Sequence, residues 1–78
     1  MKHVSLADLG AGESGKVLRV SGGWGVQRRL QALGIRPGAM VTKVSAAFRP
    51  GAVVVTAGGG QAALGHGVAR KVIVEVHP

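Results

Sequence analysis

Residues 10–17 read GAGESGKV, which is one residue short of a phosphate-binding loop. That motif, G-x-x-x-x-G-K-[ST], cradles phosphates with its backbone amides and holds Mg²⁺ with its final hydroxyl group. Here Val17 stands in the place of the hydroxyl. The loop must also follow a strand and open a helix, whereas residues 5–9 suggest one helical turn and residues 17–20 alternate as a strand does. We therefore interpret the segment as a turn that glycine permits before a strand.

Side chains that could support catalysis or bind a metal are few. The chain has no cysteine, three acidic residues and three histidines, which are Asp8, Glu13, Glu75, His3, His66 and His77. No two histidines share a close helical or hairpin spacing, and zinc or iron sites need three or four ligands. The serines also lack the G-x-S-x-G setting of a nucleophile. We expect no active site, cofactor, metal or small-molecule substrate, and predict that the chain is not an enzyme.

The charge of the chain is strongly basic. Ten Lys and Arg give a formal net charge of +7 over 78 residues, which form a single domain, residues 1–78. No apolar run is long enough to span a bilayer and no signal-peptide core follows Lys2, so we expect a cytoplasmic protein. A positive field attracts nucleic acid, an anionic membrane surface or an acidic protein face. Nucleic acid is the least favoured, because only Trp24 and Phe48 could stack on bases.

One helix is expected over about residues 24–33. Val26, Leu30 and Leu33 have the spacing i, i+4, i+7 and form one apolar stripe. We expect Leu30, Leu33 and the following Ile35 to lie in the core. Gly34 suits the left-handed position that ends many helices. On this helix Arg28 points away from the stripe and Arg29 flanks it, while Trp24 at the start is expected to pack against the sheet or lie partly exposed there.

Short alternating runs joined by tight turns surround this helix. The expected strands are residues 16–20, 40–46, 53–56, 61–64 and 72–76. Residues 36–39 and 49–52 are Pro-Gly turns of type II pattern, residues 58–60 are a glycine turn, and residues 68–70 suggest one helical turn. Five short strands with such turns are typical of a small, highly bent sheet or barrel. The expected fold is mainly β, with one inserted α-helix and a short N-terminal helical turn.

Several stretches of the chain resemble the ferrous iron transport protein A (FeoA) family. These are VSLADL at residues 4–9, GESGKV at 12–17, RRLQALGIRPG at 28–38, GQAAL at 60–64 and VIV at 72–74. The resemblance covers nearly the whole chain and implies an SH3-like five-stranded barrel with a helix inserted between the first two strands. It also implies that residues 10–17 lead into the first strand and that any nucleotide belongs to a partner protein.

The resemblance also implies a function and a partner. Members of the family are cytoplasmic accessories of FeoB, a membrane transporter of ferrous iron with a cytosolic GTP-binding domain. The chain would then be a non-enzymatic adaptor that binds the cytosolic region of FeoB and modulates Fe²⁺ uptake. A position at the inner face of the membrane is compatible with this role, because anionic lipids attract basic domains.

We expect the partner-binding residues on the helix and its exit loop. They are Arg28, Arg29, Leu33, Gly34, Ile35, Arg36, Pro37 and Gly38. Arg29 and Arg36 would meet acidic groups of the partner, because the guanidinium group is a planar fork of donors that fits a carboxylate. Gly34 and the Pro37-Gly38 pair would mainly hold the exit loop in shape.

Two other function classes stay open. The first is a small basic β-barrel that binds nucleic acid, with an affinity that falls steeply as salt is added. The second is a metal-sensing SH3-like module that uses His3, His66 or His77. Metal binding of that kind would be lost below about pH 6, as the imidazole groups become protonated.

Overall fold

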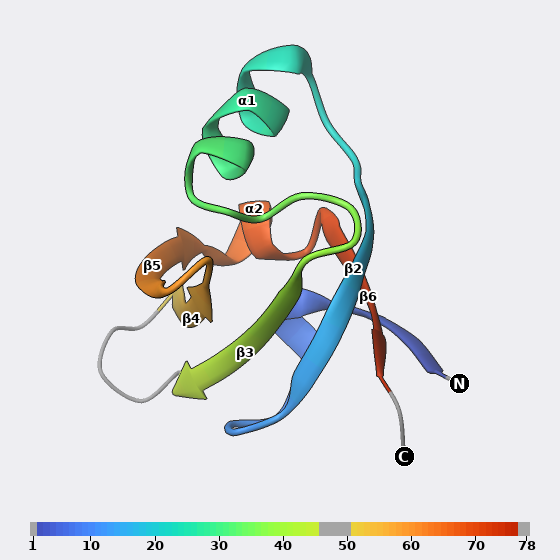
Figure 1. Ribbon diagram of the computed structural model, residues 1–78, viewed down its shortest axis with the longest axis vertical. Helices are drawn as coiled ribbons and strands as arrows, with labels where there is room; N and C mark the ends of the chain where they lie inside the picture. Colours follow the sequence, from blue (N-terminus) through green and yellow to red (C-terminus); the bar gives the residue numbers. More distant parts are fainter. Residues whose placement is uncertain (1, 46–50, 77–78) are drawn as a thin grey trace.

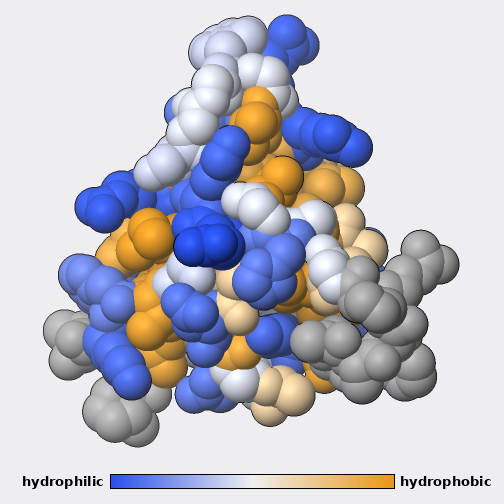
Figure 2. Space-filling model, turned by 180° about the vertical axis from the view of Figure 1, so that it is seen from behind, coloured by the Kyte–Doolittle hydropathy of each residue, from blue (hydrophilic) through white to orange (hydrophobic). Residues whose placement is uncertain are grey.

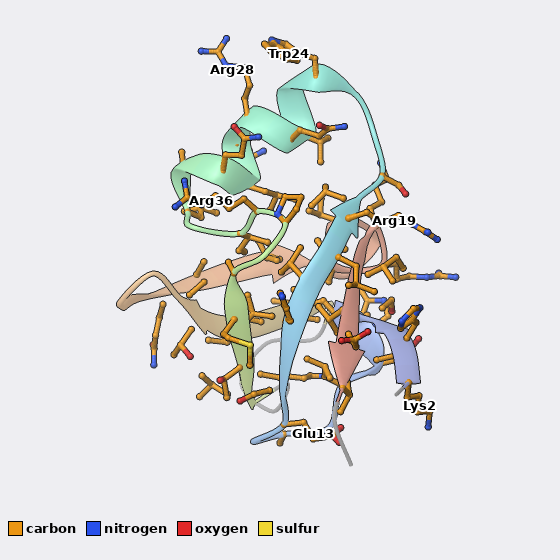
Figure 3. All side chains as sticks on the ribbon, turned by 45° about the vertical axis from the view of Figure 1, so that its right-hand side comes forward. Lys2, Glu13, Arg19, Trp24, Arg28 and Arg36 are labelled. Atoms are coloured by element: carbon orange, nitrogen blue, oxygen red, sulfur yellow. The ribbon has the colours of Figure 1, made fainter. Side chains whose placement is uncertain are left out.

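The computed structural model describes residues 2–45 and 51–76. Six antiparallel strands form one sheet in the order β1-β6-β2-β3-β4-β5, and the sheet bends so that β4 and β5 run across β2 and β6 (Figures 1 and 3). The elements are β1 (Lys2–Ser5), the 3₁₀ helix η1 (Leu6–Asp8), β2 (Ser14–Val20), α1 (Trp24–Ala32), β3 (Met40–Ser45), β4 (Ala52–Ala57), β5 (Gly60–Gly65), α2 (His66–Ala69) and β6 (Val72–Val76). This is the mainly β fold with one larger helix that the sequence predicts.

The structure contains each of the five expected strands and adds a sixth, β1. This strand pairs with β6 in a register that places Lys2 opposite Val76 and Ser5 opposite Ile73. Its sequence, KHVS, has only one apolar residue, so hydrophobic alternation could not reveal it. The expected extension of β3 to Ala46 and part of the turn at residues 49–52 lie outside the described residues.

The core is built mainly from branched aliphatic side chains of the strands. The branched residues that are no more than 2% exposed are Leu6, Leu9, Val17, Leu30, Ile35, Val41, Val53, Val55, Val72 and Val74, and Ala69 is fully buried beside them. Strand β4 alternates strictly between buried and half-buried positions, as expected for a strand with one face on the core. Helix η1 contributes Leu6, and the residue after it contributes Leu9, so this short turn also packs against the core.

One charged residue belongs to this interior. Lys43 on β3 lies on the same face as Val41 and is only 8% exposed. Its ammonium group donates hydrogen bonds to the carbonyl oxygens of Ala7 and Leu9, at 3.0 Å and 2.7 Å. These contacts join η1 to the sheet and satisfy two carbonyl groups that a short 3₁₀ turn leaves without partners.

Helix α1 ends in the way that the sequence predicts. The amide of Gly34 donates to the carbonyl of Gln31, and the amide of Ile35 donates to the carbonyl of Leu30, which is the pairing of a Schellman motif. Gly34 has the positive φ of 85° that this motif requires. The following Pro-Gly turn closes with a 3.0 Å bond from the amide of Ala39 to the carbonyl of Arg36.

Candidate partner-binding surface

Helix α1 projects from the sheet rather than lying across it (Figure 1). Of its nine residues only Leu30 is fully buried. Leu33, expected in the core, is 41% exposed, and Trp24 is 76% exposed at the far end of the helix. The predicted apolar stripe is therefore only partly covered by the rest of the chain. An apolar face left open in this way is a common sign of an interaction surface.

A groove of about 650 Å³ lies between α1 and the strand–helix segment formed by β5 and α2. Its walls are apolar side chains from both sides, namely Val26, Leu30, Ala32, Leu33, Ala62, Ala63, Leu64 and Val68, and Arg29 lines it as well. The small alanine side chains of β5 leave room that larger residues would fill. Figure 2 shows hydrophobic side chains reaching the surface below the projecting helix, with hydrophilic residues around them.

The exit loop of the helix borders a second hollow beside this groove. The hollow has a volume of about 470 Å³, and Leu33, Gly34 and Arg36 line one side of it while the Gly58 hairpin and Gln61 line the other. Leu33 lines both hollows, so Arg29, Leu33 and Arg36 lie along one continuous surface. We call this surface, with the facing residues of β5, the α1–β5 groove.

The other expected site residues are placed differently. Arg28 points away from the body of the molecule at the end of α1 (Figure 3). Pro37 lines a smaller hollow of about 200 Å³ on another side of the helix, together with Arg19. Ile35 is completely buried, so its side chain packs in the core, while Gly38 is exposed with a φ of 93° in the turn.

Half of the α1–β5 groove carries no signal in the sequence. Nothing in the sequence of residues 62–68 indicates that they face α1, which lies much earlier in the chain. The two segments meet because Gly34 and Gly58 approach closely: a Cβ atom on Gly34 would lie 3.3 Å from the Cα of Gly58. Gly58 and Gly59, both with positive φ, form the two-residue turn that brings β5 back along β4.

The charged residues that line the groove, Arg29 and Arg36, are both basic. The sequence has no carboxylate between residues 14 and 74. The three acidic side chains have local partners: Asp8 accepts from the Ser5 hydroxyl, Glu13 from the Gly10 amide, and Glu75 lies 3.3 Å from His3. Among the described residues, no Lys or Arg forms an ion pair with a carboxylate. Within the part of the chain that the structure describes, Arg29 and Arg36 therefore have no acidic partner.

The glycines of the GAGESGKV segment have structural uses. The Gly12 amide donates to the Lys43 carbonyl at 2.7 Å, and the Gly10 amide donates to Glu13 Oε1 at 2.5 Å, so neither is directed at a phosphate. A Cβ atom on Gly15 would lie 3.0 Å from Val74, because β2 and β6 pack closely there. The segment is the turn into β2, as interpreted from the sequence.

The histidines are dispersed in the part of the chain that the structure describes. His3 on β1 faces Glu75 across the sheet, and His66 begins α2. His77 lies outside the described residues. Within residues 2–45 and 51–76, no three His, Asp or Glu side chains gather as a metal ion would require. Over the same residues, no helix has the length and apolar character needed to cross a membrane.

The fold is that of a small SH3-like domain, and solved structures of iron-transport proteins share it. A crystal structure of an iron uptake regulatory protein (FeoA) is 29% identical with a TM-score of 0.86, covering 96% of this chain and 97% of that one. The solution structure of FeoA from Chlorobium tepidum is 27% identical with a TM-score of 0.83, covering 94% of this chain and 70% of that one. FeoA from Stenotrophomonas maltophilia was solved with zinc and is described as a procaryotic SH3 domain protein. It is 28% identical with a TM-score of 0.77, covering 92% of this chain and 89% of that one.

The model of the FeoA domain family matches residues 4–76, which is nearly the whole chain. The chain therefore belongs to the FeoA domain family, which is associated with ferrous iron transport and is a family of small accessory domains rather than a class of enzymes. No curated protein sequence matches the chain. The family membership confirms the resemblance carried by residues 4–9, 12–17 and 28–38.

Proposed function

We propose that this chain is a non-enzymatic accessory protein of ferrous iron transport that binds the cytosolic region of a FeoB-type transporter and modulates Fe²⁺ uptake. It would act in the cytoplasm, at the inner face of the membrane that holds the transporter. The observation that carries the proposal is the α1–β5 groove, whose apolar walls are flanked by Arg29 and Arg36 and whose described lining residues include no acidic side chain. The FeoA protein from S. maltophilia is described as a candidate ferrous iron transport activating factor, and this description supports an accessory role in iron transport for the present chain as well.

The groove suits a protein segment with an apolar face and acidic neighbours. Leu33, already 41% exposed, would be covered by the partner together with the alanines of β5. Such burial is worth roughly 25 cal/mol for each Å² of apolar surface removed from water. Arg29 and Arg36 would add charge-assisted hydrogen bonds with planar carboxylates, which give orientation as well as affinity.

The proposal is tested by measuring binding of the purified chain to the GTP-binding cytosolic region of FeoB. Arg29→Glu should weaken binding at least tenfold, because it replaces an attraction by a repulsion in a partly enclosed site. The matched control is Lys2→Glu, which makes the same charge change at the opposite end of the molecule (Figure 3). Its effect should be small, because Lys2 lies on β1, at the other end of the molecule from α1, and salt screens charges that are far apart.

The same experiment separates this proposal from its rivals. Absence of binding to a folded, GTP-competent partner would contradict it. Equal loss with both variants would show a diffuse charge effect rather than a site at the groove. Tight, steeply salt-dependent binding to an unrelated single-stranded oligonucleotide would favour the nucleic-acid alternative instead.

A further inference from the structure

The far end of α1 carries an exposed aromatic side chain beside an arginine. Trp24 is 76% exposed, and the guanidinium carbon of Arg28 lies 5.9 Å from the centre of its ring. The two residues are one helical turn apart and both point away from the body of the molecule (Figure 3). They are outside the α1–β5 groove, which begins with Val26. A tryptophan this exposed has no packing role in the fold that would explain it.

The backbone on either side of Trp24 is made of small residues. The residues before and after it are Gly23 and Gly25, and a Cβ atom on either would meet nothing within 4 Å beyond its chain neighbours and the backbone of its own helix. Ser21 and Gly22 complete an exposed, small-residue neck between β2 and the helix. The ring therefore stands exposed at the tip of the projecting helix (Figure 3).

The labelled charged side chains on this half of the molecule are all basic (Figure 3). Arg19, Arg28 and Arg36 lie on the upper half of the molecule in Figure 3, whereas Glu13 lies at the opposite end. No carboxylate occurs between residues 14 and 74, so no acidic side chain from the helix, its exit loop or the neighbouring β5 and α2 offsets these charges. The basic residues are spread over the surface rather than arranged as one fork. A spread of charge suits a diffuse anionic surface better than a single acidic pocket.

We propose that the end of α1 is a membrane-surface anchor, in which Trp24 enters the headgroup region of an anionic phospholipid bilayer and Arg28 contacts lipid phosphate. Tryptophan favours this zone because its large ring is apolar while its indole N–H needs a polar partner. Anionic lipids draw in nearby Lys and Arg side chains, and the neck allows the helix end to meet the surface first. With the end of α1 on the lipid, the α1–β5 groove stays open to a protein partner.

The chain supplies its own probe for this proposal, because Trp24 is its one tryptophan and it has no tyrosine. Fluorescence emission on excitation of tryptophan therefore reports on this side chain alone. With vesicles of phosphatidylcholine and phosphatidylglycerol, the emission should move to shorter wavelength and become protected from an aqueous quencher. Vesicles of phosphatidylcholine alone should leave it unchanged. At about 1 M salt, where the Debye length is about 3 Å, the shift should be lost.

Variants measured by vesicle co-sedimentation separate anchoring from general charge attraction. Trp24→Ala should weaken partitioning into anionic vesicles about tenfold, because burial of the ring is lost. Arg28→Gln should weaken it about fivefold, the effect of one cation near the surface. Lys2→Gln, which removes the same charge at the opposite end, is the matched control and should change it less than either. All three residues are exposed, so circular dichroism should show unchanged folding.

Three results would overturn the proposal: no emission shift with anionic vesicles, an equal shift with zwitterionic ones, or an equal loss of partitioning with Lys2→Gln and Arg28→Gln. The vesicle experiments contain no transporter, so this inference and the proposed function can fail separately.

Discussion

Gly34 meets two separate constraints, and substitution can measure each of them. Its φ of 85° lies in the left-handed region, which costs an L-residue roughly 1–2 kcal/mol. A Cβ atom there would also lie 3.3 Å from the Cα and 3.4 Å from the amide nitrogen of Gly58. Both of those atoms belong to backbone, so the hairpin must move, at a cost of about 1–2 kcal/mol. Gly34→Ala should therefore lower the free energy of unfolding by about 2–4 kcal/mol.

Two other glycines provide matched controls. Gly38 has a similar φ of 93°, but a Cβ atom there would meet nothing within 4 Å, so Gly38→Ala should show the conformational cost of about 1–2 kcal/mol alone. Gly25 lies in the helix with open space around it, and Gly25→Ala should stabilise the protein by about 0.5 kcal/mol. The expected order of stability is Gly25→Ala, wild type, Gly38→Ala and Gly34→Ala, with Gly34→Val lower still because a branched side chain resists positive φ.

Far-ultraviolet circular dichroism is the suitable readout, followed during thermal and urea unfolding. Fluorescence is less suitable, because Trp24 is already 76% exposed in the folded protein. For a domain of this size about 1 kcal/mol corresponds to roughly 4–8 °C in Tm, so Gly34→Ala should lower Tm by about 8–32 °C. If Gly34→Ala and Gly38→Ala were equally stable, the close approach to the hairpin would not contribute. If both matched wild type, the account of the helix exit would be wrong.

Three further predictions concern other parts of the molecule. Lys43→Met should lower the free energy of unfolding by about 2 kcal/mol or more in urea titrations, because it leaves the two carbonyl groups that Lys43 binds without a donor; an unchanged midpoint would contradict this role. Leu33→Asp should abolish binding to the FeoB cytosolic region while leaving Tm within a few degrees of wild type; a large fall in Tm would instead mean that Leu33 supports the fold. Equilibrium dialysis should detect no GTP on the chain alone, because the Gly12 amide is already bonded to β3; measurable binding would reopen the phosphate-loop interpretation.

The parts of this protein that the sequence determined by itself are those governed by neighbouring residues. The Schellman end of α1 depends on Gly34 and Ile35 next to one helical turn, and the Pro-Gly turn depends on four consecutive residues. The core strands can be predicted from the alternation of apolar and polar residues, because a strand with one buried face places every second side chain in the core. The absence of a nucleotide loop could likewise be read from Val17 and the order of the adjoining elements.

Tertiary structure alone decided the features that carry the proposed functions. Strand β1 exists because β6 offers it a partner, and Lys43 is interior because η1 presents two carbonyl groups to it. The α1–β5 groove forms because Gly34 and Gly58 let a hairpin approach the helix exit, at a separation along the chain that no local pattern spans. The apolar stripe on α1 predicts a helix, but it does not predict how much of that stripe the rest of the chain will bury. Leu33 and Trp24 stay exposed because α1 projects from the sheet, and burial depends on where the rest of the chain lies.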